Sequence, residues 1–288
     1  MAHDHIVRDR LPPINEMLTR LAHTDARHFQ IAALASLLVF NLTCVDFGAK
    51  PLSSALAMAV SLATQFVCTR LFGLPHLDLR SPLITGLSLS LLLRADTPWL
   101  HALAAVIAIG SKFVLRFDGK HIWNPAGLAI VVLLFTSHGV WISPGQWGTS
   151  VWLVTFLVFA AILVLNAARR TDIAVFFFVS HAGLLLARAL WLGDPLTIPM
   201  HQLQSGSLLI FTFFMITDPK TAPDSRLGRF LFGLAVAVSA HWLTFFMQMR
   251  PALYVALIAL SPLVLLIDKL LPDQRFSWTN PAPKGASR

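Results

Sequence analysis

Charged side chains are scarce in this sequence of 288 residues. Asp, Glu, Lys and Arg together make up 12% of it, about half of their share in an average soluble domain. Apolar residues account for 56%, and the mean hydropathy is +0.69. This composition excludes a soluble enzyme and indicates a polytopic, all-α membrane protein. Almost every segment between polar stretches is apolar enough to lie in lipid, so we expect a single membrane domain.

Cysteines and paired carboxylates are also nearly absent. Cys44 and Cys68 are the only two cysteines, and each stands alone in an apolar segment. This arrangement fits neither a disulfide framework nor a metal site, so we interpret both as small core residues. Asp46, Asp96 and Asp218 are scattered and do not form the pair that would indicate a proton relay. The sequence therefore predicts no metal site and argues against a proton-coupled transporter.

The most informative stretch is an aromatic apolar run, residues 211–216, that stops at Thr217-Asp218-Pro219. Pro219 and Pro223 prevent a helix from continuing into the polar residues beyond. In lipid, freed backbone N–H and C=O groups are tolerated only where they are buried in protein or line a cavity. A broken helix of this kind therefore predicts a binding site near the middle of a transporter-type fold.

A second break of the same kind lies in the first half of the chain. The short apolar run of residues 81–93 ends in Arg94-Ala95-Asp96-Thr97-Pro98. Small residues stand about ten positions before the aspartate in both runs, Gly86 in one and residues 205–207 in the other, and a long apolar segment follows each break. We interpret the two stretches as parts of an internal repeat.

The apolar segments predict about ten membrane crossings, of which the third and the eighth are broken. With the N-terminus in the cytoplasm, all of the 22 Lys and Arg residues except Lys50, Arg94, Arg188 and Arg250 fall on the cytoplasmic side. Two halves of five crossings each must be inverted relative to one another across the membrane. The expected crossings lie near residues 30–49, 51–69, 82–93, 98–115, 125–142, 151–168, 173–192, 203–216, 230–249 and 251–267.

The expected domain organisation follows from these crossings. Residues 1–27 form a cytoplasmic tail rather than a cleavable signal, because they contain no apolar core. The membrane domain takes residues 28–270, with one repeat in 28–142 and the other in 150–270, and residues 271–288 form a second cytoplasmic tail. We expect a multi-pass protein of the bacterial cytoplasmic membrane. Its excess of Lys and Arg reflects the enrichment of positive charge in cytoplasmic loops and does not indicate nucleic-acid binding.

Two motifs carry a family resemblance. Residues 215–223, Met-Ile-Thr-Asp-Pro-Lys-Thr-Ala-Pro, resemble the Thr-Asp-Pro-x-Thr signature of the membrane family that contains the D subunit of Rnf and the B subunit of Na⁺-translocating NADH:quinone reductase. In the first half, residues 109–112 and Asn124-Pro125-Ala126 resemble that family's Gly-Lys and Asn-Pro-Ala elements. The exact residues of these motifs are most similar to those of the stand-alone branch of enediyne-biosynthesis UnbU-like proteins.

The resemblance spans about residues 30–270 and implies a urea-transporter-like fold. It also implies electron transport through a membrane-bound flavin, with redox partner proteins. The electron-transfer members carry FMN covalently on a Ser/Thr-Gly-Ala-Thr sequence after the fifth crossing, and residues 142–150 contain no such tetrapeptide. We therefore expect FMN, riboflavin or a quinone to be bound non-covalently and no covalent FMN.

The candidate ligand-binding residues come from both breaks and from the two first-half motifs. Plainer interpretations remain: Asp218 could cap a helix end, and Lys112 could anchor a helix at the membrane surface. His181 and His241, inside apolar segments, could be haem ligands or hydrogen-bonded core residues. A small-molecule transporter or channel of the same fold is the alternative function, and a homo-oligomer is a further alternative for the assembly. The candidate site residues are Thr217, Asp218, Pro219, Lys220, Thr221, Asp96, Gly86, Lys112 and Asn124.

Overall fold

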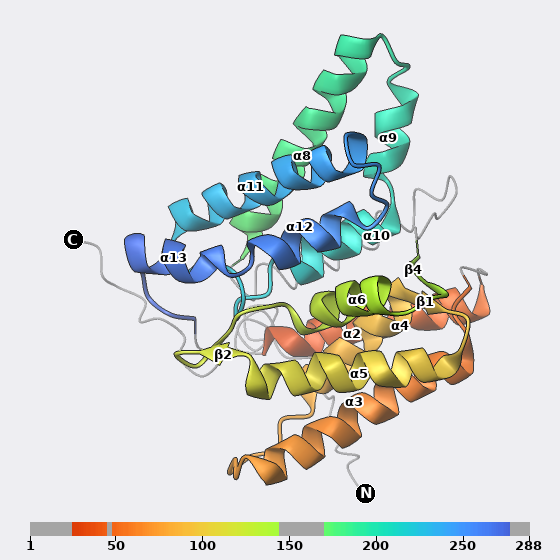
Figure 1. Ribbon diagram of the computed structural model, residues 1–288, viewed down its shortest axis with the longest axis vertical. Coiled ribbons are helices and arrows are strands. Elements are labelled where there is room, and N and C mark those ends of the chain that lie inside the picture. Colours follow the sequence, from red (N-terminus) through yellow and green to blue (C-terminus); the bar gives the residue numbers. More distant parts are fainter. Residues whose placement is uncertain (1–24, 45–47, 144–169, 277–288) are drawn as a thin grey trace, which may run out of the picture.

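The computed structural model describes residues 25–44, 48–143 and 170–276 (Figure 1). In these ranges the chain is mostly helical, with two short two-stranded sheets. The expected crossing at 151–168 lies outside the described residues, as do most of the N-terminal tail, residues 277–288 and most of the loop at 142–150.

The first half consists of helices α2 to α6. Proline stands at the start of three of them, where its missing N–H costs no hydrogen bond. Helix α3 packs against α4 and α5, α2 packs against α4, and α5 packs against α6. These helices occupy the lower part of Figure 1. Their bounds are α2 Ala26–Thr43, α3 Pro51–Leu71, α4 Arg80–Leu92, α5 Pro98–Val114 and α6 Pro125–Thr136.

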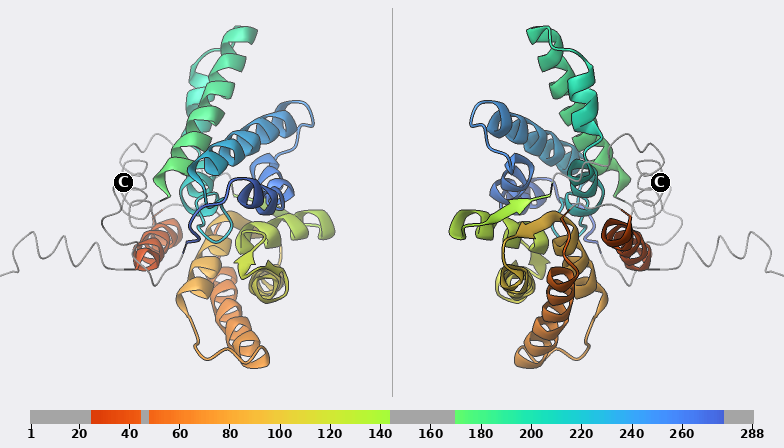
Figure 2. Two further views of the ribbon diagram at one scale, coloured as in Figure 1. Left: turned by 90° about the vertical axis from the view of Figure 1, so that its left-hand side faces the viewer. Right: turned by 90° about the vertical axis from the view of Figure 1, so that its right-hand side faces the viewer.

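The described part of the second half, in the upper part of Figure 1, contains α8 to α13. Helix α8 packs against α11, and α11 packs against α12. Helix α12 also packs against α6, so these two helices join the halves, as the two further views show (Figure 2). The bounds are α8 Thr171–Leu192, α9 Thr197–Leu203, α10 Gly206–Ile210, the π-helical turn η1 Phe211–Met215, α11 Arg226–Phe245, α12 Ala252–Leu260 and α13 Leu263–Leu270.

The two small sheets close the ends of the first half. Strand β1 (Leu93–Ala95) pairs antiparallel with β4 (Val140–Ile142), and β2 (Arg116–Phe117) pairs with β3 (Lys120–His121). The sequence predicts a helix through residues 125–142, but α6 ends at Thr136. Gly139 adopts a left-handed φ of 70° and its C=O accepts a hydrogen bond from Asp96 N at 3.0 Å. The chain therefore turns back beside the first break and is not helical there.

Glycines permit close contacts at two places in the core. A Cβ on Gly86 would lie 3.0 Å from Met58 Cα, so α4 and α3 approach closely there. A Cβ on Gly127 would lie 3.2 Å from Met215 Cε and 3.3 Å from Ile258 Cδ1, at the contact between the two halves. Larger side chains at either position would force the neighbouring elements apart.

Three described helices are long and apolar enough to cross a membrane: α3, α8 and α11. Helices α12 and α13 give a fourth candidate span if the pair, bent by 50°, is counted as one. Helices α5 and α6 and residues 206–215 are apolar but shorter. The chain is thus an integral membrane protein with several candidate spans.

Ion pairs between described residues join the loops that carry the basic residues. Arg27 and Arg80 contact Asp25 and Asp78, at the starts of α2 and α4. The other pairs join the β2–β3 hairpin, the N-terminal ends of α8 and α11, helix α13 and the segment directly after it. They are Lys120 with Asp224 and Asp268, Arg170 with Asp224, Arg229 with Asp172, and Arg275 with Asp118.

Candidate functional site

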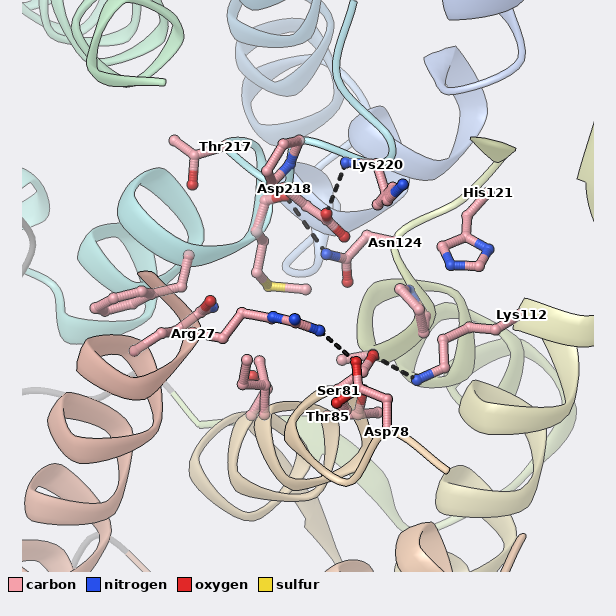
Figure 3. Close-up of a pocket in the computed structure, with 18 of the residues that line it drawn as sticks. Arg27, Asp78, Ser81, Thr85, Lys112, His121, Asn124, Thr217, Asp218 and Lys220 are labelled. Atoms are coloured by element: carbon pink, nitrogen blue, oxygen red, sulfur yellow. Dashed lines mark hydrogen bonds and ion pairs between the residues drawn. The ribbon is translucent and has the colours of Figure 1, made fainter. Parts of the chain in front are cut away.

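A cavity of about 270 Å³ lies between the two halves (Figure 3). Its walls come from the starts of α2, α4 and α6, the end of α5, and the residues of η1 and the break after it. Six of the nine candidate site residues line it: Lys112, Asn124, Thr217, Asp218, Pro219 and Lys220.

The broken helix of the second half forms one wall of the cavity. The N–H of Ile216 donates to the C=O of Phe211 at 3.1 Å, which closes a wide π-helical turn before the chain leaves the helix. Such turns often occur at functional sites. Thr217 Oγ1 then donates to the C=O of Phe213 at 2.7 Å and satisfies one carbonyl of the helix end. The sequence predicts the break but not the π turn.

Asp218 lies beyond the end of the expected eighth crossing and is partly buried. Its Oδ1 accepts a hydrogen bond from Lys220 N at 3.0 Å, the local contact expected of an aspartate in a turn. Burial raises the pKa of Asp218, opposed by this hydrogen bond and by the charges of Lys112 and Lys220. The carboxyl group therefore takes up a proton more readily than an exposed aspartate does.

Asn124 connects the two halves. Its Oδ1 caps α6 by accepting from Gly127 N at 3.0 Å, and its Nδ2 donates to the C=O of Met215 at 3.4 Å. The neighbouring Trp123 Nε1 donates to the C=O of Ile258 at 2.9 Å. The Asn-Pro-Ala element thus both starts α6 and holds the second half against it.

Lys112 comes from the last turn of α5 and is only 6% exposed. Its Nζ donates to Ser81 Oγ at 2.9 Å, and Figure 3 shows the side chain reaching into the cavity. Among the described residues, none of the ion pairs includes Lys112. A lysine that only anchored a helix at the surface would instead extend toward water.

Several lining residues were not anticipated from the sequence, among them Arg27, Asp78, Ser81 and His121. The pattern Asp-x-Arg occurs at residues 25–27 and again at 78–80, and it could have indicated that these two segments pair. Burial lowers the pKa of His121 to about 3, and the charges of Lys112, Arg116 and Lys220 act in the same direction. His121 is therefore neutral at pH 7.

Three candidate residues lie elsewhere. Asp96 is exposed and follows the end of α4, whereas the cavity is lined by the first part of that helix. Gly86 packs against α3, and Thr221 is buried behind the break, where its Oγ1 donates to the C=O of Asp218 at 3.4 Å. The two breaks therefore do not meet across this cavity. Helix α4 separates them.

A smaller cavity of about 120 Å³ lies in the first half, near the first break. Arg94 and His101 line it together with Ser90 and Ser54. The Arg94 guanidinium donates to the C=O groups of Ser90 at 2.9 Å and Leu93 at 2.8 Å. Backbone carbonyls thus hold this arginine at the end of α4.

His181 and His241, the two histidines expected inside apolar segments, lie on helices that pack together. His181 is on α8 and His241 on α11, and the Nδ1 atoms of both have no hydrogen-bond partner in the described residues. The described part of the chain contains no group of three or more His, Cys, Asp or Glu side chains placed to hold a metal ion.

Residues 138–277 match the model of the NQR2, RnfD, RnfE family. This segment is therefore similar to members of that family. The match includes the break at Asp218 but not Lys112 or Asn124. The similarity to the UnbU-like branch stays a prediction.

Curated relatives from Salmonella paratyphi B, Salmonella newport and Salmonella agona, each named as the D subunit of an ion-translocating oxidoreductase complex, are 37% identical to this chain over 100 residues. The aligned part covers 34% of this chain and 26% of each relative. The similarity thus extends over about a quarter of the relatives' length.

Proposed function

We propose that this chain is a membrane subunit of an electron-transport complex and that it binds FMN, riboflavin or a quinone non-covalently in the cavity between its halves. The observation that carries the proposal is the position of the broken helix. Thr217 and Asp218, in the half that matches the family, face Asn124 and Lys112 of the other half across one cavity.

The lining suits the ring system of such a ligand. Phe213, Phe214 and Met215 supply apolar surface, and Asn124 and Asp218 supply polar groups at its edge. Small-molecule sites typically combine a mostly apolar wall with a few polar groups that fix orientation. The volume of about 270 Å³ is slightly below the usual range of about 300–1,000 Å³. The cavity therefore accommodates a ring system but not a long isoprenoid tail, which would extend into lipid.

The proposed topology is ten crossings in two inverted halves, with both termini in the cytoplasm. Two observations support it. The ion pairs between described residues all join loops expected on the cytoplasmic side, and such contacts cannot span a hydrocarbon core of about 30 Å. The packing of α3, α5 and α6 in one half also corresponds to that of α8, α11 and α12 in the other.

Ligand titrations test the proposed site. Purified protein, freed of bound small molecules, is titrated with riboflavin, FMN and a short-chain quinone, and binding is followed by flavin and tryptophan fluorescence. We expect Asp218→Ala to abolish binding and Asp96→Ala, the matched change at an exposed aspartate, to leave it unchanged. If the wild-type protein binds none of the three ligands, the proposal is wrong.

The alternative function, a transporter or channel for a small polar solute, has one observation in its favour. The two cavities both adjoin α4, one lined by Ser81, Thr85 and Ser88 and the other by Ser90 and by Arg94 just beyond the helix. A solute could pass from one to the other along this helix. Proteoliposomes containing the protein would then take up urea or a similar solute faster than empty liposomes.

A further inference from the structure

The cavity carries more positive than negative charge. Four cationic side chains line it, Arg27, Lys112, Arg116 and Lys220, against the two carboxylates of Asp78 and Asp218. Arg27 is already paired with Asp25 and Asp78, and Arg116 is exposed, whereas Lys112 is buried and takes part in no ion pair among the described residues.

The carboxylate on the α4 side of the cavity is already engaged. Asp78 contacts Arg27 and, at 3.1 Å, Arg80. Burial alone would raise the pKa of Asp78, but the hydrogen bond from Arg80 and the charge of Arg27 hold it below its ordinary value. Asp78 therefore stays charged and is already paired with two arginines, so it is not the counter-ion of Lys112.

Lys112 has only a neutral partner in the described part of the chain. Its Nζ donates to Ser81 Oγ at 2.9 Å, and the residue is 6% exposed. Burying an ammonium group is costly unless an anion compensates it. A serine hydroxyl is a dipole and supplies only part of that compensation.

The rest of the lining leaves room for a ligand with two different ends. Figure 3 shows Asp218 and Asn124 toward one end of the cavity and Lys112 and Ser81 toward the other. A polar ring edge at Asp218 and Asn124 would leave the opposite end of the ligand beside Lys112.

We infer that the ligand carries a terminal phosphate group and that Lys112 and Ser81 bind this group. This inference rests on the proposed function. The phosphate group could belong to FMN, to a lipid of the phosphatidic acid type or to inorganic phosphate. In each case the ammonium group of Lys112 and the hydroxyl group of Ser81 would both donate hydrogen bonds to phosphate oxygens.

The test compares FMN with riboflavin, which differ only in the phosphate. We expect the wild-type protein to bind FMN about 30-fold more tightly, which corresponds to about 2 kcal/mol for a charged hydrogen bond. Lys112→Gln should remove this preference and leave the affinity for riboflavin unchanged, which also shows that the variant is folded. Lys112→Arg should retain part of the preference, and Lys269→Gln, a matched change at an exposed lysine, should retain all of it.

The outcomes separate this inference from the proposed function. Equal affinities for FMN and riboflavin, unchanged in Lys112→Gln, would refute the phosphate site while leaving the flavin site standing. If neither flavin binds but short-chain phosphatidic acid or inorganic phosphate binds in a Lys112-dependent manner, the anion site holds and the flavin proposal is wrong. If no phosphate compound binds with dependence on Lys112, the inference is overturned.

Discussion

Replacing Lys120 by Met should destabilise the protein strongly, because this lysine joins the halves through two carboxylates. Its Nζ lies 3.1 Å from Asp224 Oδ1 and 2.6 Å from Asp268 Oδ2, and the three side chains are only 12%, 6% and 19% exposed. After the change, Asp224 keeps Arg170 at 3.9 Å, but Asp268 Oδ2 loses its cationic partner. Breaking a buried pair in this way costs about 3–5 kcal/mol. We expect about 3 kcal/mol here, because Asp268 is partly exposed.

The measurement is the free energy of unfolding in detergent, followed by circular dichroism as denaturant is added. Arg275→Gln is the matched control, because Arg275 and Asp118 form an ion pair in which both side chains are 64% exposed; pairs of this kind contribute about 0–1 kcal/mol. A second change, Asp268→Asn in the Lys120→Met background, removes the uncompensated charge and keeps an acceptor for Asp224 N, so it should recover much of the lost stability. Equal small effects of Lys120→Met and Arg275→Gln would refute the reasoning.

Three further predictions concern packing, pH and topology. Gly127→Leu should lower the free energy of unfolding by about 1–3 kcal/mol and weaken ligand binding, because the new leucine side chain meets Met215 and Ile258. Gly110→Ala is the control, because a Cβ there meets nothing within 4 Å and should not destabilise the protein. Equal losses of stability in the two variants would contradict this reasoning. The pKa of Asp218 is raised in the folded state, so Asp218→Asn should increase the free energy of unfolding of the ligand-free protein at pH 7. This increase should vanish below about pH 3.9, the ordinary pKa of aspartate. An increase that is the same at all pH values would argue against a titration effect. For topology, single cysteines are placed at positions 226, 118 and 141 in a protein whose Cys44 and Cys68 are replaced by Ser. The cysteines at 226 and 118 should react with an impermeant thiol reagent only from the cytoplasmic side, and the cysteine at 141 only from the outer side. Reaction of the cysteine at 226 from outside would contradict the inverted topology.

Much of the fold could be predicted from apolar periodicity and proline positions. Pro51, Pro98 and Pro125 each begin a helix where the sequence predicts a crossing. The end of α6 could not be predicted, because Gly139 folds the chain back onto β1 through a tertiary contact and the apolar residues Val140 to Ile142 are equally compatible with helix. The π turn before the second break was missed for a similar reason, since no local signal in residues 211–215 distinguishes it from an α-helix.

The candidate site was predictable where local chemistry marks it. The Thr-Asp-Pro break and the Asn-Pro-Ala cap both identify helix ends, and both line the cavity. Asp96 belongs to a similar break, but it follows the C-terminal end of α4, near the smaller cavity. Tertiary packing decides which cavity a break adjoins, and the local sequence carries no signal of it. Arg27 and His121 belong to the cavity only through tertiary packing.

The absorption spectrum of the detergent-purified protein tests the central claim most directly. We expect bands of an oxidised flavin or a quinone that are lost on extraction with acid or organic solvent, present in Asp96→Ala and absent in Asp218→Ala. In-gel fluorescence after denaturation should be dark, because no flavin is covalently attached. A purified wild-type protein that shows no chromophore, and takes up none when incubated with flavin or quinone, would contradict the account.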